Sequence, residues 1–79
     1  MEPELKKSIL EYVLGKRKKL EISGPPRLVA TLYEAIESSR NLLEDLRKGV
    51  SQKILKESLD KKQKAAARYK KITGEDWSV

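Results

Sequence analysis

The sequence predicts an all-α protein: a small helical hairpin or three-helix arrangement, completed as a dimeric helical bundle. Apolar residues recur at helical spacing over three segments, Pro and Gly separate these segments, and no alternating run has a convincing partner strand. A chain of 79 residues accommodates one small domain. Within this domain, residues 1–79, we expect helices at about 3–14, 26–48 and 51–73, a loop at 15–25 and a tail at 74–79.

The first helix is expected to begin at Pro3, because proline suits the first helical turn and the flanking Glu2 and Glu4 complement the helix dipole. Gly15 is expected to end this helix. The apolar face of the helix consists of Leu5, Ile9, Tyr12 and Val13. The alternation that follows, at residues 19–23, resembles a short strand but lacks a partner, so we interpret it as a loop.

The second helix, from Pro26 to Lys48, carries the longest apolar stripe of the sequence. Its residues fit alternating a and d positions of a heptad pattern, which is typical of a coiled coil and equally of a bundle helix. A domain this small has a marginal core, and a second subunit would extend it. We therefore predict a homodimer. The predicted interface comprises Val29, Leu32, Ile36, Leu43, Leu46 and Val50.

Gly49 leaves two interpretations open. Followed by Ser51 as a possible N-cap, it favours a turn between two helices. A single glycine inside a continuous helix costs only about 1 kcal/mol, so one long helix is the alternative. Helix-length statistics favour the hairpin.

The third helix, about residues 51–73, has a weak apolar side. This side is formed by Leu55, Leu59, Ala66, Tyr69 and Ile72. After Leu59 it thins to alanine and charged residues, so we expect the far half of the helix to bury little. Gly74 is a good residue to end the helix.

Positive charge is concentrated in this helix. The chain has a formal net charge of +6, and the segment 61–71 holds six bases and no acid. Spaced cations can follow a phosphate backbone because they release its counterions. A second basic run begins at Lys16, where the sequence suits either a nuclear-import signal or a phosphate contact. The predicted nucleic-acid-binding residues are Lys61, Lys64, Arg68, Lys70 and Lys71 of the helix, and Lys16, Arg17 and Lys18 of the loop.

The alternative for the same charges is an ordinary solvated helix face. Glu57 and Asp60 stand four residues before Lys61 and Lys64, which is the spacing of favourable ion pairs on a helix. Tyr69 has two interpretations as well: it could stack on a base, but helix packing is favoured. Trp77 is expected to fold back over a core edge; otherwise it belongs to an acidic–aromatic peptide offered to a partner protein.

Cysteine and histidine are absent from the sequence. Disulfides are therefore excluded, as are metal sites built on thiolates or imidazoles and catalysis by a cysteine nucleophile or a histidine base. Ser58 and Lys61 have an S-x-x-K spacing, but the companion motifs of that chemistry are missing. We expect no enzyme activity, no cofactor and no metal.

The sequence also predicts where the protein works. An acidic start and the lack of a long apolar run exclude a signal peptide and a membrane span, so we expect an intracellular protein of the cytoplasm or nucleus. The first functional hypothesis is a nucleic-acid-binding protein that contacts the backbone of RNA or DNA without reading bases. The second is a helical protein–protein interaction or assembly module with no nucleic-acid ligand.

Overall fold

The computed structural model describes all 79 residues and is all-helical, with three helices and no strands. Helix α1 spans Pro3–Val13, α2 spans Pro26–Lys48 and α3 spans Gln52–Thr73. The all-α prediction is confirmed, and each helix boundary lies within one residue of its expected position. No helix combines the length and the apolarity needed to cross a bilayer.

Local chemistry explains where the helices begin and end. Proline occupies the first turn of both α1 and α2, and the hydroxyl of Ser51 accepts a hydrogen bond from the Ile54 amide at 3.4 Å to cap α3. Gly49 ends α2 with φ of 69°, and Gly74 ends α3 with φ of 77°; both values lie in the left-handed region that glycine adopts without strain. The hairpin interpretation of Gly49 is thus confirmed over one continuous helix.

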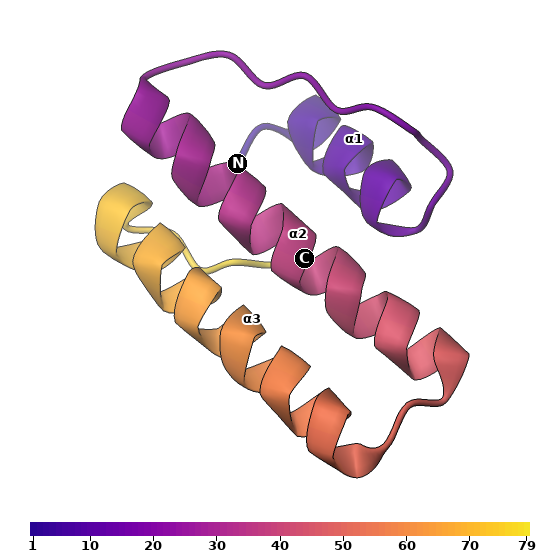
Figure 1. Cartoon of the computed structure of the whole chain (residues 1–79). Helices are drawn as coiled ribbons and strands as arrows, with labels where there is room; N and C mark the ends of the chain where they lie inside the picture. The colour runs from indigo at the N-terminus through magenta and orange to yellow at the C-terminus, as the bar shows by residue number, and fades with distance from the viewer.

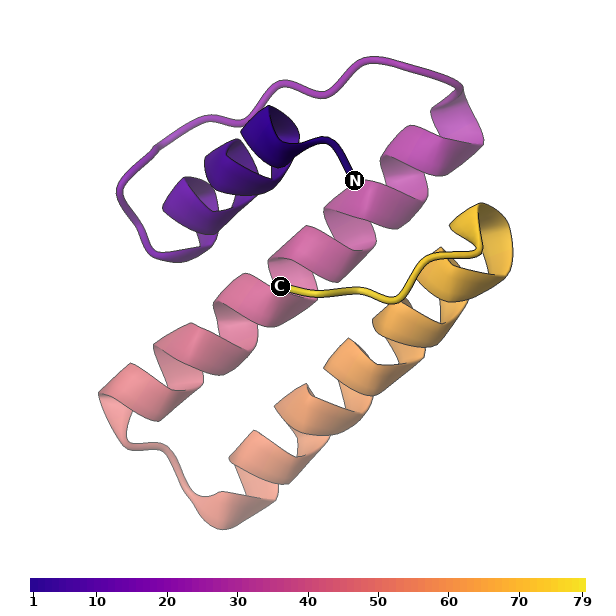
Figure 2. The same ribbon diagram turned by 180° about the vertical axis from the view of Figure 1, so that it is seen from behind.

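Helix α2 is central and packs against both other helices, whereas α1 and α3 do not pack against each other directly. The α2–α3 pair is antiparallel, and the loop after α1 returns the chain to the start of α2, so that α1 and α2 run in similar directions (Figure 1). Viewed from behind, α1 and the C-terminal tail both lie on the near face of the α2–α3 hairpin (Figure 2). The hairpin therefore has one covered face and one open face.

The core lies where α1, the loop, the tail and α3 converge on α2. Ile9 and Ile36 are completely buried at its centre. The other buried members of this cluster are Val13, Leu20, Leu32 and Tyr69. Leu20 shows how the loop takes part, because its carbonyl accepts a hydrogen bond from the Tyr33 hydroxyl at 2.7 Å. The loop interpretation of residues 19–23 is confirmed.

The tail folds back over the core, as expected. The indole nitrogen of Trp77 donates to the buried Ser39 hydroxyl at 2.9 Å, and its ring meets Tyr69 edge to face with 5.1 Å between centroids. Aromatic pairs favour this geometry. Trp77 is thus an anchor of the core edge, and Tyr69, almost wholly buried, is a packing residue.

The rotation of α3 differs from the prediction. Leu59 and Ile72, expected on the apolar side, are 45% and 37% exposed, while Ala65 and Tyr69 are buried. Two contacts fix this rotation: the Tyr69 ring packs under Trp77, and the Ser58 hydroxyl donates to the Asp45 carboxylate of α2. The small side chains of Ala35 and Ala65 are buried, whereas the larger Leu59 is exposed.

The predicted interface stripe on α2 divides into two halves. Leu32 and Ile36 are buried inside the monomer, because the loop and the tail add to the cover that α1 provides. Toward the turn, Leu43 and Val50 are only half-buried and Leu46 is 56% exposed. Val29, at the other end of the stripe, is half-buried as well. The dimer stays a prediction, and Leu46 is the most exposed member of its predicted interface.

Candidate nucleic-acid interface

Helix α3 holds the charge imbalance of the protein. It contains eight of the 18 Lys and Arg residues and two of the 12 acids, so its own formal charge equals the net charge of +6. The rest of the chain is balanced. Every base of α3 except the half-buried Lys62 is exposed, and the Lys62 amine donates to the main-chain oxygen of Val79 at 3.3 Å.

Three of the five predicted cations of α3 are engaged in ion pairs. The Lys64 amine lies 3.0 Å from the Asp60 carboxylate, which confirms the pair expected from helical spacing. The Lys70 amine lies 3.0 Å from the Asp76 carboxylate of the tail. Arg68 pairs with Glu34 of α2. Acids of α2 and of the tail thus pair with cations of the segment 61–71, which contains no acid of its own.

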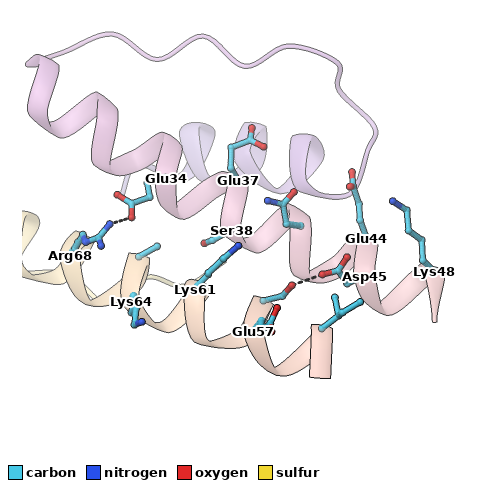
Figure 3. A pocket seen from close by; sticks show the side chains of 14 residues that line it. Glu34, Glu37, Ser38, Glu44, Asp45, Lys48, Glu57, Lys61, Lys64 and Arg68 are labelled. Atoms are coloured by element: carbon cyan, nitrogen blue, oxygen red, sulfur yellow. Dashed lines mark hydrogen bonds and ion pairs between the residues drawn. The ribbon is translucent and has the colours of Figure 1, made fainter. Parts of the chain in front are cut away.

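A polar groove of about 620 Å³ opens between α2 and α3. In Figure 3, α1 lies behind α2, on the far side from the groove. Acids of α2, among them Glu34 and Asp45, form one wall, and cations of α3, among them Lys61 and Arg68, form the other. Figure 3 shows Lys61 directed across the groove toward Ser38. The acidic wall repels phosphate, and paired charges already bridge the groove, so its floor is a poor place for a polyanion.

The solvent side of α3 is different. At about 100° per residue, Lys53, Lys56, Lys64 and Lys71 fall within a sector of about 80° opposite the buried Tyr69, and all four are exposed. We call these four lysines the outer stripe. Asp60 also lies in this sector and is the partner of Lys64. Figure 3 shows Lys64 pointing away from α2 into solvent.

The predicted cations of the loop lie elsewhere. Lys16, Arg17 and Lys18 are exposed just after α1, and Arg17 lies 3.5 Å from Glu11 of that helix. This end of α1 adjoins the last turn of α2, where Arg47 donates to the Leu14 carbonyl at 3.4 Å. Because α2 separates α1 from α3, the structure does not bring the loop cations together with those of α3.

A further polar cluster joins α1 to α2. The Tyr12 hydroxyl donates to the Glu37 carboxylate at 2.5 Å, and the Arg40 guanidinium lies 4.5 Å from the centre of the Tyr12 ring. The hydrogen bond to Glu37, together with burial, raises the pKa of Tyr12. Arg40 also pairs with Glu44 at 3.2 Å, as the four-residue spacing of that pair indicates.

Sequence reasoning missed the acids that enter the site from other elements. Glu34 lies in α2 and Asp76 lies in the tail, outside the helix of their partners. The spacing rules for a single helix therefore do not predict these two pairs. No signal in the sequence gives the relative rotation of α2 and α3, on which the Glu34–Arg68 pair depends. Helical spacing also allows an ion pair between Glu57 and Lys61, but both side chains line the groove instead.

Comparisons of the chain with protein-family models, with curated proteins and with solved structures find no match.

Proposed function

We propose that this protein binds nucleic acid, RNA or DNA, by contacting the phosphate backbone along the solvent side of α3. The observation that carries the proposal is the location of the entire net charge on one exposed helix. A cationic surface of this kind raises the local concentration of polyanions, and neutralised phosphates release counterions.

The length of the outer stripe suits a backbone. Lys53 and Lys71 are 18 residues apart in one helix, so the stripe extends for about 27 Å, with Lys56 and Lys64 between them. This is about the axial length of eight base pairs of duplex DNA. The contacts are with phosphates and carry no sequence information, so binding is directed by charge and shape.

Existing ion pairs do not prevent this binding. Exposed pairs contribute only about 0–1 kcal/mol, and the side chain of Lys64 is 68% exposed despite its contact with Asp60. A phosphate can therefore replace such a partner at small cost. The acidic wall of the groove repels phosphates, so the nucleic-acid backbone binds on the outer side of α3.

The test compares two variants of equal net charge. The first, Lys56→Gln with Lys64→Gln and Lys71→Gln, removes three members of the outer stripe. The second, Lys7→Gln with Arg27→Gln and Lys48→Gln, removes three exposed cations that are scattered over α1 and α2. Gln is a helix former comparable to Lys and Arg, so both variants should keep their helicity.

Fluorescence anisotropy with labelled duplex DNA, duplex RNA and single strands measures affinity. At about 0.1 M salt, loss of one phosphate contact weakens binding severalfold by counterion release alone. We expect the first variant to lose affinity by tenfold or more and the second to lose clearly less. Equal losses would show that only total charge matters, and the assignment to α3 would be wrong.

A second candidate function, a helical protein-interaction module, is favoured by one specific observation. Large apolar side chains are exposed at the turn end of the α2–α3 hairpin, most of all Leu46. Isolated surface leucines are normal in soluble proteins, whereas adjoining ones mark interaction sites.

A further inference from the structure

Five apolar residues continue along the covered face of the hairpin toward its turn, and the first of them, Leu43, packs against the edge of the core. We call them the apolar strip: Leu43 and Leu46 of α2, Val50 of the turn that follows α2, and Leu55 and Leu59 of α3. Leu46 and Leu59 are large exposed side chains, and the other three are half-buried.

Contacts of the tail place the strip on this face. Trp77 binds Ser39, and Leu43 and Leu46 follow Ser39 by one and two turns on the same side of α2. Val79 lies at Lys62, and Leu59 precedes Lys62 by one turn on the same side of α3. The strip is therefore the continuation of the surface that the tail covers.

In Figure 2 the ribbons of α1 and the tail stop short of the turn end of the hairpin, and Arg47 reaches back from the last turn of α2 to the Leu14 carbonyl. Helix α1 ends at Val13, and the tail stops at the middle of α2. Leu46 and Leu59 are therefore exposed.

The side chains that flank the strip most closely are cationic. By helical spacing its flanks carry Arg47 on α2, and Lys56 and Lys62 on α3. Of the four acids of the same turns, Glu44 pairs with Arg40 and Asp45 accepts from Ser58. Glu57 and Asp60 share a surface hollow with Leu59 and Lys56, and Asp60 pairs with Lys64. An apolar strip with a cationic rim is complementary to an apolar stripe with acidic flanks.

The tail shows that this surface accepts such chemistry. It combines apolar anchors, Trp77 and Val79, with the acids Glu75 and Asp76. Asp76 pairs with Lys70 of α3, while Trp77 packs on Tyr69. The covered half of the surface is therefore occupied by an acidic segment with apolar anchors.

We propose that the apolar strip is the docking site for a short, acidic amphipathic helix of a partner protein. Helices that lie beside two packed helices bury one apolar stripe between them, with anchors at i, i+3 or i+4, and i+7. Leu55 and Leu59 are four residues apart in α3, about 6 Å along its axis, which corresponds to one helical turn of such a partner. The site shares Lys56 with the outer stripe, but none of its apolar residues belongs to that stripe, so the leucine variants below test docking without removing a phosphate contact.

The probe is a synthetic acidic peptide, about three turns long, with leucines in one helical stripe and glutamates beside them. Two control peptides are matched to it: one has the same composition with the leucines dispersed around the helix, and the other has lysine in place of glutamate. Isothermal titration measures affinity, and amide chemical shifts of isotopically labelled protein report where each peptide binds.

We expect the acidic amphipathic peptide to bind at least tenfold more tightly than either control peptide and to shift the amides around Leu43, Leu46 and Leu59. Leu46→Gln with Leu59→Gln should weaken binding by about tenfold per leucine. Both residues are exposed in the monomer, so the fold should persist. The matched control is Ile54→Gln with Ile72→Gln, two exposed isoleucines of α3 outside the strip, which should bind as wild type does.

Three results would overturn the proposal. The first is equal or absent binding of all three peptides. The second is a shift of the strip amides with protein concentration alone, which would identify a second copy of this chain as the occupant. The third is perturbation of the strip by anionic phosphatidylglycerol vesicles but not by the acidic peptide, which would identify a lipid surface.

Discussion

The tail is the most informative place to perturb the fold, because six residues after α3 complete the core. We consider Trp77→Ala. Truncation of a buried tryptophan to alanine costs about 3–5 kcal/mol, and Trp77 is half-buried, which lowers that figure. The substitution also leaves the buried Ser39 hydroxyl without its donor and removes the edge-to-face contact with Tyr69. These losses add about 1–2 kcal/mol.

Together they predict a loss of about 3 kcal/mol in the free energy of unfolding. Domains of this length have a total of about 4–12 kcal/mol, so the melting temperature should fall by about 12–24 °C. Urea denaturation followed by helical ellipticity measures the change. Trp77→Phe, which keeps an aromatic ring but loses the N–H donor, should cost less.

The exposed neighbour Ser78 provides a control, because Ser78→Ala should leave stability unchanged. A loss of less than about 0.5 kcal/mol for Trp77→Ala, the range of ordinary surface substitutions, would refute the reasoning. It would mean that the tail rests on the hairpin without contributing to its stability.

The remaining predictions concern the turn, one ion pair and the response to alkali. Gly49→Ala forces a Cβ into the left-handed region and should cost about 1–2 kcal/mol in a urea titration, with Gly49→Asn costing less. Arg68→Gln should change stability by less than about 1 kcal/mol, since its pair with Glu34 is solvent-exposed. Burial, and next the hydrogen bond to Glu75, raise the pKa of Tyr69. As pH rises, this tyrosine ionises in the unfolded protein before it ionises in the folded protein. The stabilisation that comes from the neutral, buried Tyr69 is therefore complete below about pH 10 and is lost as pH rises further. Tyr69→Phe should flatten this alkaline loss of stability, measured in unfolding titrations at about pH 9–11.

The sequence is sufficient for the features that local chemistry decides. Pro3 and Pro26 set helix starts, Ser51 caps α3, and Gly49 and Gly74 end helices, so the helix boundaries could be predicted closely. The apolar face of α1 and the Asp60–Lys64 pair follow from spacing within one helix for the same reason.

Features that depend on how helices face one another could not be predicted. The hydrophobic side of α3 is too weak to set its rotation, and the Ser58–Asp45 hydrogen bond and the Tyr69–Trp77 contact set it instead. The same rotation brings Glu34 to Arg68. An acid-free run of sequence is therefore a partly neutralised face in space, whereas the grouping of the four outer-stripe lysines on one side of α3 follows from helical spacing alone.

The salt dependence of nucleic-acid binding tests the central claim most directly. The logarithm of the binding constant of the wild-type protein for duplex DNA should fall linearly with the logarithm of salt concentration. Removal of Lys56, Lys64 and Lys71 as phosphate contacts should reduce the magnitude of this slope by about 2.7, which is about 0.9 for each contact. The slope should stay near the wild-type value when Lys7, Arg27 and Lys48 are replaced by Gln. A wild-type affinity insensitive to salt, or the same slope for the outer-stripe variant and the wild type, would contradict phosphate binding by α3.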